Sequence, residues 1–257
     1  MPKNYDTHPP PGNRVSSGIA GADAAGDGNS ARANQILAAL SNLDQFATKL
    51  RPVTLELGEI LYKPEQPIEH VYFPTSGVIS LLAAFEDGTT VEAGVIGSEG
   101  VLGTSVVLGS EITPHQALVQ ANGHALKMGV RDLRAEIQKD GLMLDLLLLY
   151  TQALFVQVAQ TAACNRAHTL EQRLARWLLL THDRVRKDEF ELTQEFLSRM
   201  LGVRRAGVSV AANTLRELRA IDYRRGNVIV LDRKGLERAS CECYQVVRAE
   251  YDRLSQR

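Results

Sequence analysis

The sequence predicts an α+β protein with an antiparallel β-domain, one long helix and a C-terminal winged helix-turn-helix. Three observations predict this order. Short apolar runs separated by glycine and proline fill residues 53–127, an apolar repeat of three and four residues covers 141–167, and a helix-turn-helix pattern followed by two β-rich runs occupies 192–231.

The expected strands of the β-domain are short runs of β-branched and aromatic residues that end at turn residues. Strands of this length and spacing are typical of antiparallel sandwiches and barrels. The strongest hairpin signal is Asp87-Gly88, because an Asp-Gly pair readily adopts the tight turn between two strands. We expect strands at 53–57, 60–62, 70–73, 77–84, 89–95 and 117–120.

The helix expected over 141–167 has two apolar stripes. One follows the alternating spacing of a two-stranded coiled coil and predicts a dimer interface at Leu142, Leu146, Leu149, Ala153, Val156, Gln160 and Ala163. The other, from Leu147 to Thr161, can cover the β-domain. A helix that is apolar on two sides needs two partners, so we expect the same helix of a second copy to be one of them. The alternative is a single buried helix in a monomer.

A helix-turn-helix is expected between Leu192 and Ser209. Thr193 can cap a first helix whose apolar face ends at Leu201, and Gly202 can form the turn. Arg204, Arg205 and Ser209 then open a second helix. Arginines in a first turn oppose the helix dipole, so another partner must favour them there, and a polyanion would. This layout is that of a helix-turn-helix that binds double-stranded DNA.

Two β-rich runs after the second helix predict a wing with a basic turn. Within 199–234, nine basic residues face three acidic ones, although the whole chain has a formal net charge of −1. A basic patch on an otherwise acidic chain places the nucleic-acid contact at one end. The expected DNA-binding residues are Thr193, Arg204, Arg205, Ser209, Arg224 and Arg225. The alternative is an ordinary helical pair with a solvated basic face.

The chain is expected to divide into four segments. Residues 1–34 contain few large apolar residues and predict a disordered tail. A β-domain at 35–138 would begin with a helix over 36–49, and the long helix would cover 139–168. Residues 169–257 would form the DNA-binding domain, opened by a capping box at Thr169 and Gln172 and closed by one terminal helix that Asp232 caps.

Composition indicates a cytoplasmic protein without membrane contact. No run approaches the ~20 apolar residues that span a bilayer, because Asp145 interrupts the most apolar stretch, and no signal pattern opens the chain. Cys164, Cys241 and Cys243 are too few for a disulfide framework or an all-cysteine iron–sulfur site, and Cys241 and Cys243 would point to different faces of a helix. We expect ordinary thiols, no metal site and no cofactor.

This order of elements resembles the cyclic-AMP receptor and fumarate–nitrate regulator (Crp-Fnr) family of bacterial transcription factors. The resemblance covers roughly 50–240 and is carried by the strand pattern from Leu57-Gly58 to Gly103, by the run 171–175 (EQRLA) and by 192–208. It implies a β-roll sensor domain of the cyclic-nucleotide-binding type, a homodimer on a two-fold symmetric operator, a sensor that biases the DNA-binding domains, and RNA polymerase as a partner.

The resemblance also implies how the recognition helix works. Arg205 matches the arginine that family members direct into the major groove, where a bidentate contact discriminates guanine. Two other reading positions differ from the family pattern, with Ala206 in place of a glutamate and Val210 in place of an arginine. The operator is therefore expected to differ from the best-known site of the family.

The ligand pocket that the resemblance implies lacks its usual polar residues. Family members that bind cyclic nucleotides carry a glutamate for the ribose and an arginine for the phosphate. Here Val101 precedes Leu102 at the first position, and His115 and Gln116 occupy the second. A phosphate would enter without its main counter-charge, so we expect no regulation by cyclic AMP or cyclic GMP, and the effector is unknown.

Two other functions compete with a transcription regulator. A cupin-like catalytic barrel needs clustered histidine and carboxylate ligands or a nucleophile with its base, and the sequence has neither pattern, so we do not expect an enzyme. A ligand-binding regulatory module without DNA activity would share the β-domain. The paired arginines Arg204 and Arg205 and the basic wing argue against that alternative.

Overall fold

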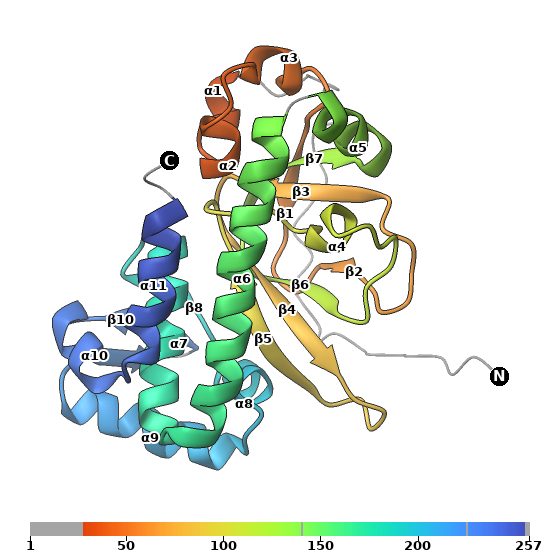
Figure 1. Ribbon diagram of the computed structural model, residues 1–257. Coiled ribbons are helices and arrows are strands. Elements are labelled where there is room, and N and C mark those ends of the chain that lie inside the picture. Colours follow the sequence, from red (N-terminus) through yellow and green to blue (C-terminus); the bar gives the residue numbers. More distant parts are fainter. Residues whose placement is uncertain (1–27, 140, 225, 255–257) are drawn as a thin grey trace, which may run out of the picture.

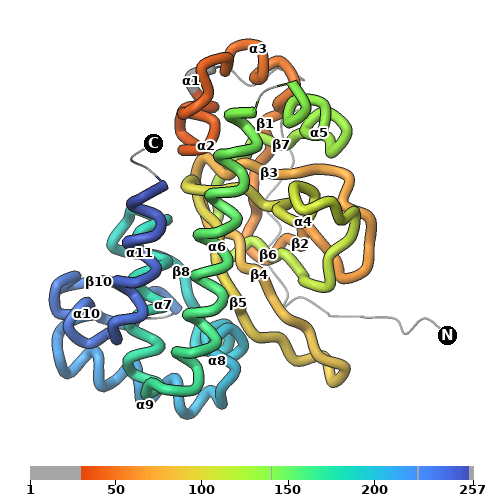
Figure 2. The backbone as a smooth tube through the Cα atoms, viewed as in Figure 1, coloured from red at the N-terminus to blue at the C-terminus, as the bar shows by residue number. Residues whose placement is uncertain are grey.

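The computed structural model describes residues 28–139, 141–224 and 226–254. The long helix α6 (Gly141–Ala167) runs down the middle of the molecule, with the β-domain on one side and the C-terminal helices on the other (Figures 1 and 2). The predicted α+β architecture is confirmed, and the helix has the expected bounds.

Two antiparallel sheets form the β-domain. One has the strand order β1-β7-β3 and the other β2-β6-β4-β5. The β4–β5 hairpin turns at Gly88, whose φ of 82° suits glycine, and the Asp87 carboxylate accepts a hydrogen bond of 2.9 Å from the Thr89 amide. The strands are β1 (Arg51–Leu55), β2 (Ile60–Tyr62), β3 (His70–Pro74), β4 (Val78–Ala84), β5 (Thr90–Ile96), β6 (Gln116–Ala121) and β7 (Gly123–Gly129).

Strand β7 and the helices α4 (Thr104–Val107) and α5 (Val130–Lys139) were not predicted from the sequence. Strand β7 begins and ends with glycine and follows β6 after one residue, so it has no run of turn residues before it. Its place between β1 and β3 comes from long-range pairing such as Val53 with Ala125 and Phe73 with Leu126. Local propensity does not encode such pairing.

The segment before the sheets is ordered further toward the N-terminus than expected. The tail was predicted to extend to residue 34, but α1 (Gly28–Ala31) is a helix and both Ala31 and Asn34 are buried. The Asn34 amide donates hydrogen bonds to the carbonyls of Pro74 at 2.9 Å and Gly100 at 2.8 Å, which fixes this segment on the β-domain. The rest of the predicted tail, 1–27, lies outside the described residues.

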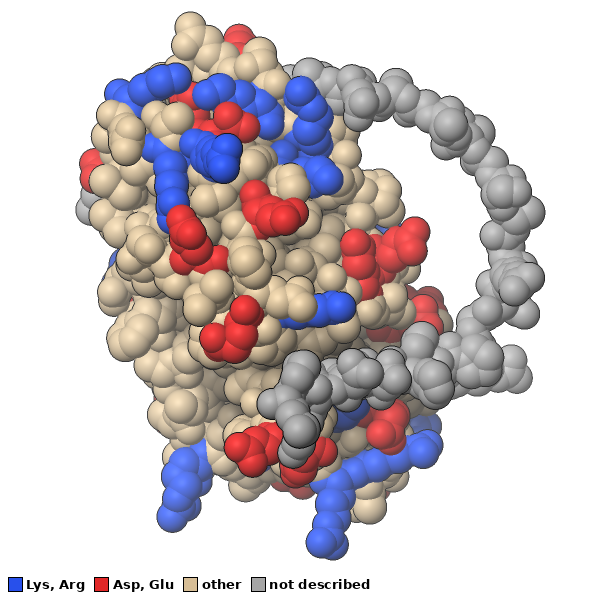
Figure 3. Space-filling view, turned by 90° about the vertical axis from the view of Figure 1, so that its right-hand side faces the viewer, with Lys and Arg blue, Asp and Glu red and all other residues tan. Residues whose placement is uncertain are grey.

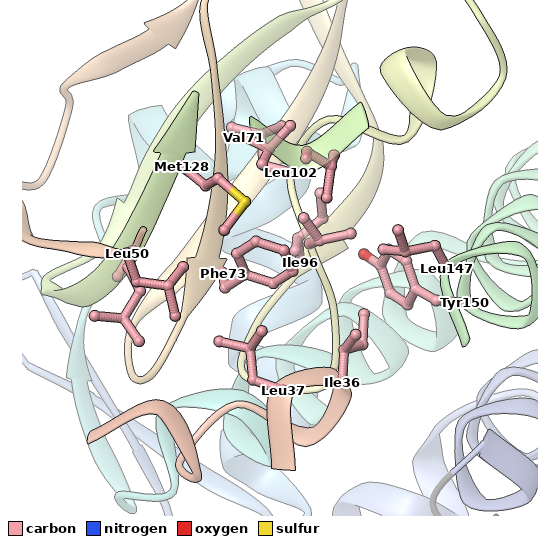
Figure 4. Packing of buried hydrophobic residues seen from close by; sticks show 14 of the residues in the cluster. Ile36, Leu37, Leu50, Val71, Phe73, Ile96, Leu102, Met128, Leu147 and Tyr150 are labelled. Atoms are coloured by element: carbon pink, nitrogen blue, oxygen red, sulfur yellow. The ribbon is translucent and has the colours of Figure 1, made fainter. Parts of the chain in front are cut away.

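The single helix expected over 36–49 is instead two short ones, α2 (Gln35–Ala38) and α3 (Leu43–Ala47). The apolar positions on which that prediction rested are all buried, so the pattern identified the contact face and missed the break between the helices. Figure 4 shows how Ile36 and Leu37 meet Phe73 and Ile96 from the sheets and Leu147 and Tyr150 from α6.

Helix α6 packs on its own chain on two sides, against β5 and against the C-terminal helix α11 (Cys243–Leu254). By length and composition it is apolar enough to cross a membrane, contrary to the expectation from the sequence, and 39% of its most apolar stretch is buried. The core helix of a soluble protein can have the same length and composition, so these two properties alone are weak evidence for a membrane span.

The C-terminal domain begins with α7 (Leu170–Val185), and the predicted capping box of Thr169 and Gln172 is present. It continues through β8 (Glu189–Glu191), α8 (Gln194–Leu201), α9 (Arg205–Glu217), β9 (Ile221–Arg224), β10 (Asn227–Val230) and α10 (Arg233–Ala239) to α11. The single terminal helix predicted after Asp232 is wrong, because the chain breaks between Ser240 and Cys243, and the Asp232 side chain makes no capping hydrogen bond.

The C-terminal domain packs directly on the sensor sheet through α7. Val78, Leu82 and Val95 of the sheet share one core with Trp177 and Leu178 of α7. A buried polar network crosses the same contact. The Trp177 indole donates to the Glu92 carboxylate at 2.7 Å, and the Gln120 amide donates to the Thr181 hydroxyl at 2.9 Å.

Burial raises the pKa of Glu92 from 4.5 to about 7, against the opposing effect of hydrogen bonds from Ser80 and Trp177. The folded protein therefore binds a proton that the unfolded chain has released between about pH 4.5 and 7. The contribution of this carboxyl to the free energy of unfolding is greatest at low pH, falls as the pH rises through that window, and is constant above it.

Glu92→Gln should remove the fall in the free energy of unfolding between about pH 4.5 and 7, because a neutral amide has no charged form to desolvate. At pH 8 the variant should therefore be more stable than the wild type by up to about 3 kcal/mol. Urea unfolding of both proteins from pH 4.5 to 8 measures the effect. The exposed Glu86→Gln is the control and should leave the profile unchanged. A wild-type profile parallel to that of Glu92→Gln would contradict the prediction.

Candidate nucleic-acid interface

Helix α8 begins where the sequence predicts. The Thr193 hydroxyl accepts a hydrogen bond of 3.1 Å from the Phe196 amide and so caps the helix. Leu197, Met200 and Leu201 on its inner face are buried in the core shared with α7. The Thr193 side chain lies at an exposed helix start, where a phosphate oxygen could also approach it.

Gly202 forms the turn between α8 and α9 in the left-handed conformation, with φ 64°. A Cβ at this position would lie 2.9 Å from Val91 of β5, so both the backbone conformation and the packing require glycine. This turn sets α9 across α8 and brings it against α7, where Val208, Ala212 and Leu215 are buried. The opposite face of α9 is left to solvent.

Arg204 and Arg205 lie at the start of α9 with exposed side chains. Within the part of the chain that the structure describes, neither forms an ion pair with a carboxylate, although the nearby Arg216 and Arg224 both pair with Asp222. Two guanidinium groups thus lie at the positive end of a helix dipole, an arrangement that favours an anionic partner.

Ser209 differs from the other predicted contacts because it is half-buried and already bonded. Its hydroxyl donates to the Gln194 side-chain oxygen at 2.7 Å, which joins α8 to α9. Gln194 was not among the predicted contacts. It is the first residue of α8, and its side-chain oxygen accepts the hydrogen bond of Ser209 from α9, which leaves its amide nitrogen as a donor next to the helix start. Only the crossing of the two helices places it there.

The wing is a three-stranded sheet with the order β8-β10-β9, one strand more than the predicted hairpin. The Tyr223 hydroxyl donates to the Leu192 carbonyl, and the Leu192 amide donates to the Gly226 carbonyl at 2.6 Å, so the wing is fixed to the start of α8. Arg224 is exposed and pairs with Asp222 at 2.5 Å, so its charge is partly neutralised. Arg225 lies outside the described residues.

The space-filling view shows where charge gathers on one face of the molecule (Figure 3). Basic side chains lie at the top, the end that holds α3 and α5 in Figure 1, and others project from the lower end, where α8 and α9 lie. Acidic side chains lie between the two ends and also beside the basic ones at the lower end, so this view shows mixed charge there. The positive charge at the start of α9 comes from Arg204 and Arg205, which are exposed and form no ion pair with a carboxylate among the described residues.

Two family models match the chain, and they match its two structural halves. One, described as a cyclic nucleotide-binding domain, matches residues 52–140. The other, described as a Crp-like helix-turn-helix domain, matches residues 172–239 and so covers α7, the helix-turn-helix and the wing. The chain belongs to the Crp-Fnr family. These domains are those of a DNA-binding transcription regulator.

Solved structures of Crp-Fnr regulators have the same fold. FixK2 from Bradyrhizobium japonicum is 16% identical with a TM-score of 0.64, and the match covers 75% of this chain and 98% of that one. A CRP/FNR-family transcriptional regulator from Thermus thermophilus is 17% identical with a TM-score of 0.58, over 74% and 98% of the two chains.

A third similar structure is the c-di-GMP responsive global regulator CLP from Xanthomonas campestris, which is 14% identical with a TM-score of 0.58, over 73% of this chain and 97% of that one. A comparison with curated proteins gives no match. At these identities the structural likeness speaks for the fold alone, and the ligand of this chain must be argued from its own residues.

The sensor domain contains a small cavity of about 70 Å³ at the expected pocket. Leu102 and His115 line it, as predicted. Val101 is instead fully buried, and Gln116 lies on β6 away from the lining. The side chains around it come from Tyr62, Leu81, Ile96, Leu102, Thr104, Ser105, Thr113 and His115, so no lining residue is an arginine or a lysine.

Helix α6 leaves one apolar face exposed, but this face is not the predicted seam. Leu146 and Ala153 of that seam are buried within the chain, and Gln160 donates to Cys243 of α11, because α11 packs where the seam was expected. The exposed positions are Leu148, 43% exposed, and Phe155, 67% exposed, followed by Ala159 and Ala162. Leu148 and Phe155 are seven residues, two helical turns, apart, and Ala159 and Ala162 follow at intervals of four and three.

The other residues of the predicted seam lie beside this exposed face. Leu142 and Ala163 are exposed, and Leu149 and Val156 are half-buried. The predicted seam is therefore partly covered within the chain, and the exposed apolar residues lie on a neighbouring face of the helix. Periodicity alone could not show this, because only the packing of α11 decides which positions of α6 are covered.

Proposed function

We propose that this regulator is a homodimer that reads a two-fold symmetric operator through α9, with the sensor domain biasing the position of the two DNA-binding domains. The observation that carries the proposal is the exposed pair Arg204 and Arg205, which has no carboxylate partner among the described residues and lies at the start of a helix fixed across α8 by Gly202. The helix presents these cations to solvent, where a major groove would fit it.

Within this proposal Arg205 contacts base edges, and Arg204, Gln194 and Thr193 contact bases or backbone beside it. Ser209 acts indirectly by orienting Gln194, since its hydroxyl donates to that side chain. Arg224 of the wing is placed toward a phosphate strand, and Arg225, which lies outside the described residues, is proposed to bind the same strand. Such a protein works in the cytoplasm, with RNA polymerase as a further partner.

The proposed dimer forms through the exposed face of α6, centred on Leu148 and Phe155. An exposed phenylalanine and leucine on one stripe of a long helix are explained when a second copy covers them. A two-fold axis along α6 would bring the two recognition helices to half-sites about 34–36 Å apart, one turn of DNA.

The sensor domain is proposed not to respond to cyclic AMP or cyclic GMP. A cavity of about 70 Å³ is small beside the ~300 Å³ or more of ordinary ligand pockets. Its lining has no guanidinium to compensate a buried phosphate. A smaller or uncharged effector would fit these walls better.

Arg205→Ala should lower the preference for the operator over random duplex by about 1–3 kcal/mol, roughly 5- to 150-fold, because a bidentate base contact is lost. Selection from random duplexes followed by gel-shift titration measures this preference. Arg205→Lys keeps the positive charge but lacks the planar guanidinium that donates two hydrogen bonds to one base, so it should also lose sequence preference. Arg134→Ala in the sensor domain should keep it. Unchanged sequence preference in Arg205→Ala would refute the assignment, and a wild-type chain that binds no duplex would refute the proposed function.

Phe155→Asp should turn the dimer into monomers and abolish tight operator binding, because each chain would bury an unpaired carboxylate at the interface. Light scattering and gel shifts at micromolar protein measure the two effects. Leu108→Asp changes a similarly exposed leucine, 65% exposed, on the sensor and should remain dimeric. A wild-type monomer at micromolar concentration would contradict the proposed assembly.

Calorimetric titration with cyclic AMP or cyclic GMP should give no binding at micromolar nucleotide, and neither nucleotide should change the affinity for DNA. A cyclic-AMP receptor titrated in parallel is the positive control. A dissociation constant in the low micromolar range, accompanied by a change in DNA affinity, would show that other side chains replace the missing arginine.

A further inference from the structure

Four side chains that can bind a transition metal meet where α6 ends and α11 begins. Cys164 and His168 lie one helical turn apart at the end of α6, and Cys241 and Cys243 lie at the break between α10 and α11. Their ligand atoms all lie within 4.8 Å of one another, although the two pairs are more than 70 residues apart in sequence.

The distances agree with a tetrahedral site. The sulfur atoms of Cys164 and Cys241 are 3.5 Å apart, and the Cys243 sulfur is 3.5 Å from Nδ1 of His168. Zinc bonds of about 2.3 Å to sulfur and about 2.0–2.1 Å to nitrogen place neighbouring ligand atoms of a tetrahedron about 3.5–3.8 Å apart. Two edges of the tetrahedron are therefore already close to their final length.

The outer contacts of the cluster are those of a metal site. Nε2 of His168, the nitrogen that does not face the cysteines, lies 3.3 Å from the Glu242 carboxylate. A carboxylate on the far nitrogen orients a ligating histidine and strengthens it as a donor. The Gln160 amide donates to the Cys243 sulfur at 3.1 Å, a contact that favours a thiolate.

A buried cation also lies beside the cluster. Arg176 is 4% exposed, its Nη atoms donate to the Thr161 hydroxyl at 3.3 Å, and its buried Nε has no hydrogen-bond partner. No carboxylate among the described residues is within ion-pair distance of it. A zinc ion with three thiolates and one neutral imidazole carries one net negative charge, which would compensate this arginine.

We propose that Cys164, His168, Cys241 and Cys243 bind one zinc ion. All four ligands come from the protein, so no coordination position remains open and the site is structural. It joins the end of the proposed dimerisation helix to the C-terminal helices of the DNA-binding domain. The inference uses only the folded chain and does not depend on dimerisation or on DNA binding.

Ordinary thiols were predicted here because two cysteines two residues apart diverge on a helix. Cys241 precedes α11, so the pair is not on one helix and the two sulfur atoms converge. A disulfide between Cys164 and Cys241 is the competing arrangement. It would need their sulfurs to move from 3.5 Å to about 2.05 Å, and it would leave Cys243 and His168 without a role.

The first experiment measures metal in the full-length protein, expressed with zinc supplied and purified under reducing conditions without chelator. Elemental analysis should give about one zinc per chain after gel filtration. Replacement by Co²⁺ should give the thiolate-to-cobalt charge-transfer and strong visible bands of a tetrahedral complex. A folded wild-type protein that retains no zinc and gives no such bands would overturn the proposal, as would mass mapping of a Cys164–Cys241 disulfide in place of the metal.

Variants then test the individual ligands. Cys243→Ser should lose zinc, whereas His168→Cys should keep it and shift the cobalt spectrum toward that of a four-cysteine site. Glu242→Gln should keep the fold and lower zinc affinity about 10- to 100-fold, because it removes the charge that orients the histidine. His124→Ala, at an exposed histidine elsewhere, is the control. Zinc content unchanged in Cys243→Ser would overturn the assignment of this ligand set.

Discussion

The contact between the four-stranded sensor sheet and α7 is the constraint on which the rest of this structure depends. Helices α8, α9 and α10 are positioned by α7, and α7 is positioned by the sheet through one continuous apolar core. Under the proposed function, a signal from the sensor domain would reach α9 through this contact, through the contact of α8 with β5, or through α6. The fixed Gly202 turn adds a second point of contact, because it touches Val91 of β5.

Polar groups inside this contact make it sensitive to small changes. The Glu92 carboxylate is buried, accepts from Trp177 and Ser80, and has a pKa raised to about 7 by burial. Apolar packing alone would hold the two domains together with little preference for one orientation. The directional hydrogen bonds of Glu92 with Trp177 and Ser80 specify one orientation, and because the pKa of this carboxyl is close to 7, the stability of the contact depends on proton uptake.

Helix α6 has three kinds of surface, and each has its own consequence. One side joins the β-domain through Leu147 and Tyr150, a second joins α11, and a third leaves Leu148 and Phe155 exposed. Two contacts lie close together along this helix, the proposed dimer face and the proposed zinc cluster at its end. A change in how two copies cross would therefore be passed to the DNA-binding domain through a stiff connection.

Much of this architecture was predictable from local patterns. Periodicity predicted the bounds of α6, while Thr193, Gly202 and the following arginines predicted α8, the turn and α9, because caps, turns and amphipathic faces are encoded within a few residues. The short strands and the Asp87-Gly88 turn predicted the β-domain for the same reason. The absence of a phosphate-binding arginine is likewise visible in the residues themselves.

What the sequence could not determine were the features that need two distant segments at once. Periodicity could not show which positions of α6 are covered within the chain, because that depends on the packing of α11, and β7 was not predicted because its partners lie far away in the chain. Gln194 and the cluster of Cys164, His168, Cys241 and Cys243 emerge only from helix crossings. Local propensity selects helices, strands and turns, but burial and the meeting of side chains depend on tertiary packing, which decides which faces are covered and which ligands converge.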